Sequence, residues 1–191
     1  MSVPVVAIDG PSASGKGAVA VRVSQVLGFH CLESGALYRL VAFAGPDTPE
    51  RTAETMQVEF RDGRIFLSQQ DVTDALRDEA VATRASDVAR RPGVRTALLQ
   101  RQRAFRKPPG LVAEGRDMGT VVFPDAELKV FLTATPAVRA QRRYKQLKDK
   151  GVSVIFDDLL REILARDARD ANRAVAPLRP ADAAVCIDTT G

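Results

Sequence analysis

A glycine-rich segment near the start of the chain has the spacing of a phosphate-binding loop. It reads Gly10-Pro-Ser-Ala-Ser-Gly15-Lys16, follows a short apolar run and opens a helical pattern. In such a loop the glycines let backbone N–H groups turn towards phosphate oxygens, and the positive end of the next helix adds to the attraction. The lysine places a mobile cation beside the β and γ phosphates of a nucleotide. The alternative is an ordinary glycine-rich turn, but the preceding strand, the spacing, the lysine and the following helix all agree with a phosphate loop.

The residues after this lysine depart from the usual continuation. A Ser or Thr hydroxyl normally helps to hold magnesium there, whereas Gly17 and Ala18 follow here. Gly17 suggests a form shifted by one residue, in which Ala18 takes the hydroxyl position. We therefore expect no direct protein ligand to magnesium, which would be held through phosphate oxygens and water with a carboxylate nearby. The candidate carboxylates are those of Asp9, Glu114 and Asp117.

Three further segments place charged and hydroxyl side chains after apolar runs or at helical spacing. They are Glu33-Ser-Gly-Ala-Leu-Tyr-Arg39, Glu114-Gly-Arg-Asp-Met-Gly-Thr-Val-Val-Phe-Pro-Asp125 and Arg166-Asp-Ala-Arg-Asp-Ala-Asn-Arg-Ala-Val-Ala-Pro177. A phosphoryl acceptor that approaches a triphosphate needs fixed cations on both sides. We expect Arg39 and Arg116 to supply them at the carboxyl ends of a sheet, where open α/β folds bind ligands. Taken alone, Arg39 could equally be a solvated helix arginine.

The third of these segments predicts a mobile lid. Arg166, Arg169, Asp170 and Arg173 are spaced i, i+3, i+4 and i+7, so on one helix they share a face. Three guanidiniums beside one carboxylate repel one another until anions arrive, and closing over bound nucleotides would exclude water. The alternative is a solvated face that is laced by ion pairs such as Glu162 with Arg166.

Composition limits the class of protein without choosing the ligand. The 191 residues carry 28 basic and 24 acidic side chains, for a net charge of +4, and 22 of the basic side chains are arginine. Guanidinium matches phosphate or carboxylate bidentately, so nucleic acid, nucleotides and acidic metabolites all stay open. With 45% apolar and 27% charged residues, disorder and collagen-like structure are excluded, and no apolar run approaches the ~20 residues of a membrane span.

Alternating apolar runs and helical patterns predict an α/β fold with a five-stranded parallel sheet and helices on both faces. The expected strands are 3–8, 29–32, 111–113, 128–133 and 183–187. The expected helices are 16–27, 37–44, 79–90, 94–106, 136–150 and 154–173.

An insertion interrupts this rhythm. Residues 57–72 alternate apolar and polar side chains around Asp62-Gly63, a strong signal for an antiparallel hairpin, and residues 45–50 read as a linker. We expect a core of 1–44, 92–135 and 174–191, an insertion of 45–91 and a helical lid of 136–173. At this length we expect a single domain around that core.

The remaining chemistry-bearing residues favour a reducing compartment. Cys31 and Cys186 are the only cysteines, so a disulfide framework is not expected, although one bridge between them stays open. The first residues enter an apolar strand without a basic segment, so we expect no signal peptide and a cytoplasmic location. No Ser-His-Asp arrangement and no metal-binding cysteine pattern occurs, and we expect the sole histidine, His30, to be structural.

Together the four motifs closely resemble those of the bacterial cytidylate kinases, which are P-loop nucleoside monophosphate kinases, over nearly the whole chain from Pro4 to Thr190. The resemblance implies a P-loop kinase with a small NMP-binding insertion and a lid. It implies transfer of the γ-phosphoryl group of ATP to CMP or dCMP, with Mg²⁺, to give CDP or dCDP in pyrimidine nucleotide metabolism. Glu33 and Glu114 stand where the family pattern has Asp, and Ala18 stands at the hydroxyl position.

The resemblance also assigns residue roles. The ATP-binding residues would be Gly10, Pro11, Ser12, Ala13, Ser14, Gly15, Lys16, Gly17 and Ala18. The acceptor phosphate would be held by Ser34, Arg39 and Arg116, and the base by Ser86, Arg95 and Asp117. Arg166 and Asp170 would reach the ribose hydroxyl, and Arg173 the phosphates. The catalytic residues would then be Lys16, Arg116 and Arg173.

The resemblance does not remove the other interpretations of these residues. Without the resemblance, Ser86 could simply be a polar helix residue and Arg95 a charge on a helix surface. Arg142 or Arg143 is a further candidate for covering the ATP phosphates or the adenine. The alternatives for function are a sibling kinase for UMP, AMP or a small metabolite such as shikimate, and a non-enzymatic P-loop nucleotide-binding module or nucleic-acid binder. A guanine-reading Asn-Lys-x-Asp is absent. We expect a monomer that binds neither nucleic acid nor membrane.

Overall fold

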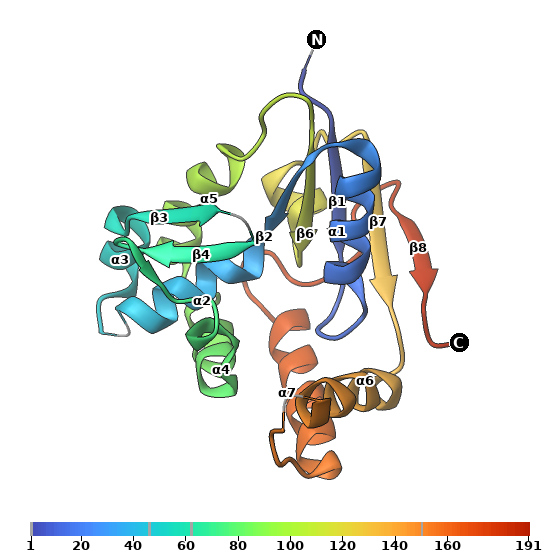
Figure 1. Ribbon diagram of the computed structural model, residues 1–191. Helices are drawn as coiled ribbons and strands as arrows, with labels where there is room; N and C mark the ends of the chain where they lie inside the picture. The colour runs from blue at the N-terminus through green and yellow to red at the C-terminus, as the bar shows by residue number, and fades with distance from the viewer. Residues whose placement is uncertain (1, 46, 62, 150) are drawn as a thin grey trace. The chain divides into compact units, whose positions relative to one another are not determined.

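The computed structural model describes residues 2–45, 47–61, 63–149 and 151–191, which form two compact units. The first unit combines the residues up to Leu32 with Phe105–Gly191, and the second is Glu33–Ala104 (Figure 1). The functional boundaries of the insertion and the lid stay predictions.

The first unit is built on a five-stranded sheet with the order β2-β6-β1-β7-β8. The strands are β1 (Val5–Asp9), β2 (His30–Glu33), β6 (Leu111–Gly115), β7 (Leu128–Thr133) and β8 (Val185–Asp188). The neighbours β1 and β6, β1 and β7, and β7 and β8 all run parallel. All five residues of β6 are buried, as a strand covered on both faces requires. The predicted five-stranded parallel sheet is confirmed, and no strand end differs from the prediction by more than two residues.

The strand register brings the carboxyl ends of the central strands together. Asp9, the last residue of β1, lies opposite Gly115 of β6 and Phe131 of β7. The chain leaves β1 through residues 10–15 and leaves β6 through residues 116 and 117. The two loops with the most promising chemistry therefore start from neighbouring strands at the same edge of the sheet.

Three long helices complete the first unit: α1 (Lys16–Leu27), α6 (Pro136–Asp149) and α7 (Phe156–Ala171). Ala20 of α1 packs with Ile8, Val112 and Leu132 in a core on the sheet. Helices α6 and α7 pack against each other, with Tyr144 and Phe156 in edge-to-face contact at 6.2 Å between ring centroids. The last residue of the predicted helix 136–150 lies outside the described residues.

The predicted helix 154–173 is too long, because α7 begins at Phe156 and ends at Ala171. Arg173 therefore lies beyond the helix rather than on its face. A short helix, η2 (Met118–Val122), follows β6 and was not predicted.

The second unit contains a small antiparallel sheet and four helices among its described residues. Its strands are β3 (Val58–Arg61), β4 (Arg64–Leu67) and β5 (Gln70–Asp71). Its helices are α2 (Ser34–Ala44), α3 (Pro49–Thr55), α4 (Glu79–Val88) and α5 (Pro92–Arg103), with a 3-10 turn η1 (Ala75–Arg77). The predicted hairpin is confirmed by the pairing of Arg61 with Arg64, and Gly63 has the left-handed φ of 71° that the turn needs. Asp62, the other turn residue of that prediction, lies outside the described residues.

The interpretation of residues 45–50 as a linker is wrong in its second half. Helix α3 begins at Pro49, because proline suits the first turn of a helix, where its missing N–H costs nothing. Pro46 lies outside the described residues. The third strand, β5, was also missed, since two residues carry no detectable alternation.

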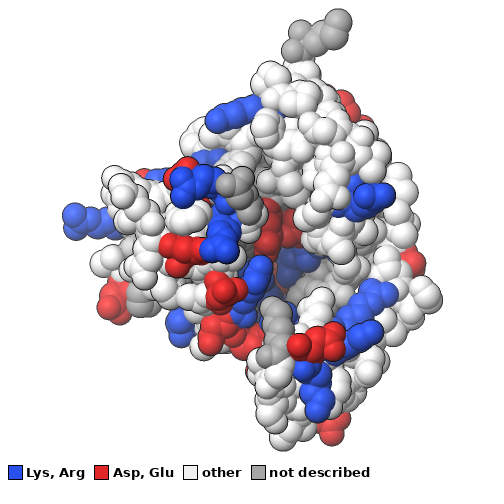
Figure 2. Space-filling view, in the orientation of Figure 1, with Lys and Arg blue, Asp and Glu red and all other residues white. Residues whose placement is uncertain are grey.

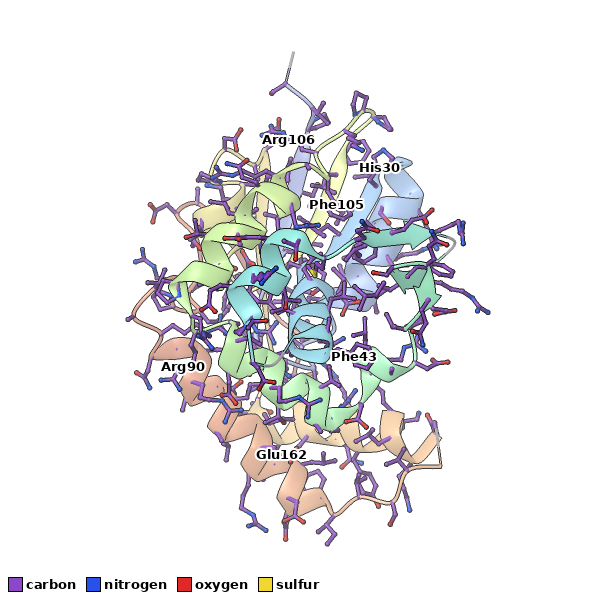
Figure 3. All side chains as sticks on the ribbon, turned by 90° about the vertical axis from the view of Figure 1, so that its left-hand side faces the viewer. His30, Phe43, Arg90, Phe105, Arg106 and Glu162 are labelled. Carbon is purple, nitrogen blue, oxygen red and sulfur yellow. The ribbon has the colours of Figure 1, made fainter. Side chains whose placement is uncertain are left out.

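Two smaller expectations concern Cys31, Cys186 and His30. No disulfide joins the two cysteines. The Nε2 atom of His30, labelled in Figure 3, lies 3.0 Å from the carbonyl oxygen of Pro108, which is consistent with a structural role. Among the described residues, no helix has both the length and the apolar character that crossing a membrane requires.

Candidate active site

The loop between β1 and α1 has the backbone conformation of an anion-binding nest. Gly10 has φ of 152°, and a Cβ atom at this position would lie 2.1 Å from the carbonyl oxygen of Leu132, so only glycine fits. Ala13 and Gly15 also adopt positive φ, at 57° and 92°. Gly15 is the N-cap of α1 and offers no side chain to the first N–H groups of the helix. These groups point where an anion binds.

Three carbonyl groups of this loop receive side-chain donors. Lys16 Nζ lies 3.0 Å from the oxygen of Pro11, and an Arg139 Nη1 lies 3.3 Å from that of Ser12. The hydroxyl of Thr189 lies 3.2 Å from the oxygen of Ser14. With these carbonyls engaged, the loop keeps its shape before any nucleotide arrives.

Lys16, which the sequence predicts to be a mobile cation, is the first residue of α1. It is 8% exposed, and its Nζ lies 3.8 Å from Oε2 of Glu114, a buried carboxylate in β6. The ammonium group therefore rests between a loop carbonyl and a carboxylate. A phosphate in the loop offers it a third, stronger partner.

Asp9 is buried directly beside the loop, with 3% of its surface exposed. Its Oδ1 and Oδ2 each accept a hydrogen bond of 2.8 Å, from the backbone N–H groups of Met118 and Gly119. Burial raises the pKa of Asp9 to about 6, and the two backbone hydrogen bonds only partly oppose this shift.

The oxygen donors around the loop fit a magnesium ion held mainly by phosphates and water. Both oxygens of Asp9 already accept backbone hydrogen bonds, and Glu114 lies beside Lys16. The Ser14 hydroxyl is buried and has no hydrogen-bond partner among the described residues. No group of three or more His, Cys, Asp or Glu side chains in the described parts of the chain has the arrangement of a metal site. Beside phosphates, Mg²⁺ usually binds oxygen atoms of the phosphates, of water and of one or two carboxylates, and is not enclosed by protein ligands alone.

A compact charge cluster joins the loop after β6 to the end of α7. Asp170 is 1% exposed and accepts hydrogen bonds from Arg116 Nε at 2.9 Å and from Arg173. Burial by itself would raise the pKa of Asp170, but Arg116, Arg173 and the nearby Arg166 outweigh it and lower the pKa below its usual value. Two guanidiniums sharing one carboxylate leave net positive charge for an anion.

The second unit holds the other predicted binding residues in its helices. Ser34 begins α2 and is buried, while Arg39 of the same helix bonds to Glu33 at 3.1 Å. Ser86 of α4 is buried, and its hydroxyl has no hydrogen-bond partner among the described residues. Arg95 of α5 is buried, donates to the carbonyl of Ala89 at 3.2 Å and lies over the ring of Tyr38. Burial argues against Arg95 as a surface charge.

The structure also shows residues that sequence reasoning assigned differently or overlooked. Arg139 is 3% exposed and forms two hydrogen bonds with Asp167, one of 3.0 Å. Arg142, a candidate for covering ATP, bonds instead to the hydroxyl and carbonyl of Thr189. Partners 28 and 47 residues apart leave no spacing signal, so only the folded chain reveals them.

A phosphate loop at the carboxyl end of a parallel sheet, followed by a helix and faced by a buried lysine and paired arginines, defines a P-loop nucleotide-binding protein of the kinase type. The sequence profile of the family described as cytidylate kinase matches residues 6–191. The chain belongs to the cytidylate kinase family.

Individual relatives agree with this assignment. The cytidylate kinase of Cupriavidus pinatubonensis is 56% identical over 197 residues, which cover 98% of this chain and 89% of that protein. That of Cupriavidus necator is 55% identical with the same coverage. That of Burkholderia cenocepacia is 56% identical over 196 residues, covering 98% of this chain and 86% of the relative. The predicted family and the prediction of an ATP-dependent CMP or dCMP kinase are thereby confirmed.

Proposed function

We propose that this cytidylate kinase divides its work between a donor group of residues and an acceptor group. The donor group is the loop of residues 10–18, which takes the phosphates of ATP. The acceptor group takes CMP or dCMP and gives CDP or dCDP. The observation that carries this division is that Lys16 and Arg116 follow the carboxyl ends of the neighbouring strands β1 and β6. Each of the two cations pairs with a buried carboxylate, Lys16 with Glu114 and Arg116 with Asp170.

On the donor side, the loop N–H groups and the α1 N-terminus bind the phosphate oxygens. Lys16 then leaves the carbonyl of Pro11 and follows the γ-phosphoryl group as it moves, because negative charge develops on its oxygens. Mg²⁺, when bound, would help to neutralise the same charge. Glu114 keeps the lysine ammonium close to this position.

On the acceptor side, phosphoryl transfer needs cations that position a dianion in line with ATP. Arg116 and Arg173 are held by Asp170 in a fixed arrangement, so little ordering is left for the moment of binding. We assign Ser34 and Arg39 of the second unit to the same phosphate. The carboxylate of Asp170 and the guanidinium of Arg166 are assigned to the ribose.

Base choice falls to Asp117, with Ser86 and Arg95 in the second unit. Cytosine presents an amino group where uracil has a carbonyl oxygen, so a carboxylate accepts a hydrogen bond from cytosine and repels uracil. Asp117 is buried and lies two residues beyond the end of β6. Such a contact supplies about 1–3 kcal/mol of discrimination.

The test of this assignment is Asp117→Ala in a coupled assay for ADP. We expect the KM for CMP to rise about 10- to 100-fold, as loss of one good base contact implies. The KM for ATP should stay within about threefold, because the phosphate loop is untouched. Asp182→Ala, an exposed carboxylate in the same unit, is the control. Equal losses for CMP and ATP would contradict the base-reading role.

The proposal extends to the setting in which the enzyme works. Every residue assigned a role belongs to one chain, and we propose a monomer. We also propose a cytoplasmic location. Gel filtration at the concentration of the assay checks the first point, and a dimer would contradict it.

A further inference from the structure

Asp9 accepts two hydrogen bonds from backbone N–H groups of a distant part of the chain. The carboxylate is 3% exposed, and its two oxygens accept from the N–H groups of Met118 and Gly119, 109 and 110 residues further along the chain. Both bonds measure 2.8 Å, the length of a charge-assisted bond. Burying a carboxylate costs free energy unless hydrogen bonds compensate for it, so the partners of Asp9 indicate its role.

These bonds bracket two residues of the acceptor group. The backbone of Asp9 lies in register with Gly115 of β6, and the side chain of Asp9 holds Met118. Only Arg116 and Asp117 lie between Gly115 and Met118. One residue of β1 therefore fixes the chain immediately before and immediately after this pair.

The hydrogen bonds of Asp9 to Met118 and Gly119 also replace a missing helix cap. Met118 and Gly119 supply the first two N–H groups of η2, and these groups have no partner inside the helix. Asp117 occupies the N-cap position, but its side chain forms no capping bond. Met118 and Gly119 are buried, so water cannot replace the missing acceptor, and an unmet N–H would be costly. Asp9 supplies the cap across the sheet.

The phosphate loop, which follows Asp9 directly, is held by other residues. Lys16, Arg139 and Thr189 contact its carbonyl groups at Pro11, Ser12 and Ser14. Loss of the Asp9 carboxylate removes none of these contacts. The consequences should therefore fall on Arg116 and Asp117 rather than on the loop.

We propose that Asp9 is a positioning residue for the acceptor nucleotide, which sets Arg116 and Asp117 in place by pinning both ends of the turn that carries them. The inference rests on the proposed function, in which Arg116 takes the acceptor phosphate and Asp117 the base. It adds a specificity role for a carboxylate that touches neither nucleotide.

The experiment compares Asp9→Asn with a matched control, Val112→Ala, in the full chain. Asn keeps the shape but sets an N–H against one of the two backbone N–H groups. Val112 is buried in β6 and packs with Ile8, Ala20 and Leu132, so its truncation weakens the core rather than the hydrogen bonds of Asp9. KM and kcat are measured for CMP, UMP and ATP, and the magnesium requirement is measured alongside.

For Asp9→Asn we expect the KM for CMP to rise at least tenfold, the preference for CMP over UMP to fall, and the KM for ATP to change less than threefold. Val112→Ala should leave the KM for CMP, the preference for CMP over UMP and the KM for ATP within about twofold of their wild-type values. Equal changes for CMP and ATP would overturn the inference, since Asp9 would then be a general structural residue. A raised magnesium requirement with an unchanged KM for CMP would also overturn it, in favour of a role towards the metal.

Asp9→Glu provides the second variant if Asp9→Asn does not fold. It keeps the charge and both acceptor oxygens but lengthens the side chain by one methylene, so it should displace the turn and again raise the KM for CMP selectively. If neither variant folds, Asp9 serves the whole fold, and the local role is wrong. A wild-type chain that fails to phosphorylate CMP contradicts the proposed function itself, whereas an active wild type with no CMP-selective loss in the variants contradicts this inference alone.

Discussion

Lys16 contacts both a loop carbonyl and a carboxylate of the neighbouring strand. Its Nζ is shared between the carbonyl of Pro11 and the carboxylate of Glu114. Both contacts can be given up for a phosphate, because the carbonyl is neutral and the 3.8 Å separation from Glu114 is long for an ion pair of full strength. In the proposed mechanism, the ammonium group of Lys16 therefore exchanges these contacts for a phosphate oxygen without breaking a strong ion pair.

Replacing this lysine tests the donor side of the mechanism. Lys16→Ala should lower kcat by about 10²–10³ or more, since it removes a cation that stabilises the transition state. Circular dichroism and the thermal midpoint should stay close to wild type. Lys107→Ala, which removes an exposed lysine from a loop, should leave kcat unchanged. A Lys16→Ala enzyme with substantial turnover would contradict the phosphate-loop mechanism.

The raised pKa of Asp9 predicts a pH dependence of stability with a definite sign. Its pKa is about 6 in the folded chain against 3.8 for an ordinary Asp, mainly because of burial. The carboxyl group therefore stabilises the fold fully below about pH 4, and this contribution disappears as the pH rises through 6. The change amounts to roughly 3 kcal/mol, at about 1.4 kcal/mol per pH unit.

Urea unfolding of wild type and Asp9→Asn at pH 4, 5, 6 and 7 isolates this contribution, because Asn does not titrate. The free energy of unfolding of the wild type, relative to the variant, should fall between pH 4 and 6 and level off above. A difference that does not depend on pH would show that Asp9 has an ordinary pKa. Other carboxylates, such as Asp170 with its lowered pKa, cancel in the comparison.

Local spacing reveals only some of these residues. The loop from Gly10 to Lys16 is contiguous, so its pattern is visible in the sequence. Arg139 and Thr189 act on the same loop from 127 and 175 residues away, and Asp9 acts on η2 across the sheet. Their roles arise from strand order, which no local pattern contains.

At the scale of elements, the long periodic segments were predictable and the short ones were not. Strand β7 and helix α1 match their predicted bounds. Helix α3 was missed because its proline reads as a breaker, and β5 because it has two residues. The predicted arginine stripe breaks at its end, since Arg173 lies beyond α7 yet still reaches Asp170.

A partly buried ion pair also joins α6 to α7. Arg139 of α6 bonds to Asp167 of α7 and to the carbonyls of Ala134 and Ser12. Asp167→Ala leaves the buried guanidinium without its carboxylate. The expected loss of stability is about 2 kcal/mol, below the ~3–5 kcal/mol of a fully buried pair because Asp167 is partly exposed.

Chemical denaturation of Asp167→Ala against Asp158→Ala measures this loss. Asp158 lies on the same helix and pairs with Arg161 in solvent, so its removal should cost less than about 1 kcal/mol. If the two variants lose the same stability, the Arg139–Asp167 pair does not hold the helices together.

For the whole molecule, the net charge of +4 says less than the placement of arginines. On the face in Figure 2, basic and acidic side chains lie close together. Several exposed arginines pair with carboxylates, namely Arg61 with Glu59, Arg64 with Asp71, Arg77 with Asp74, Arg91 with Glu50 and Arg161 with Asp158. Such pairs add little stability and lower the local positive charge. The guanidiniums that we assign to function are those of Arg95, which is buried, and of Arg116 and Arg173, which pair with the buried Asp170.

The central claim is that these arginines and Asp117 make the chain a kinase selective for cytosine nucleotides. The most direct test incubates the protein with ATP, Mg²⁺ and one acceptor at a time, CMP, dCMP, UMP or AMP, and measures the ADP that forms. We predict turnover of CMP and dCMP with kcat/KM at least about tenfold above that of UMP and AMP, as one discriminating base contact implies. A preference for AMP or UMP, or no ADP with any acceptor, would contradict the account.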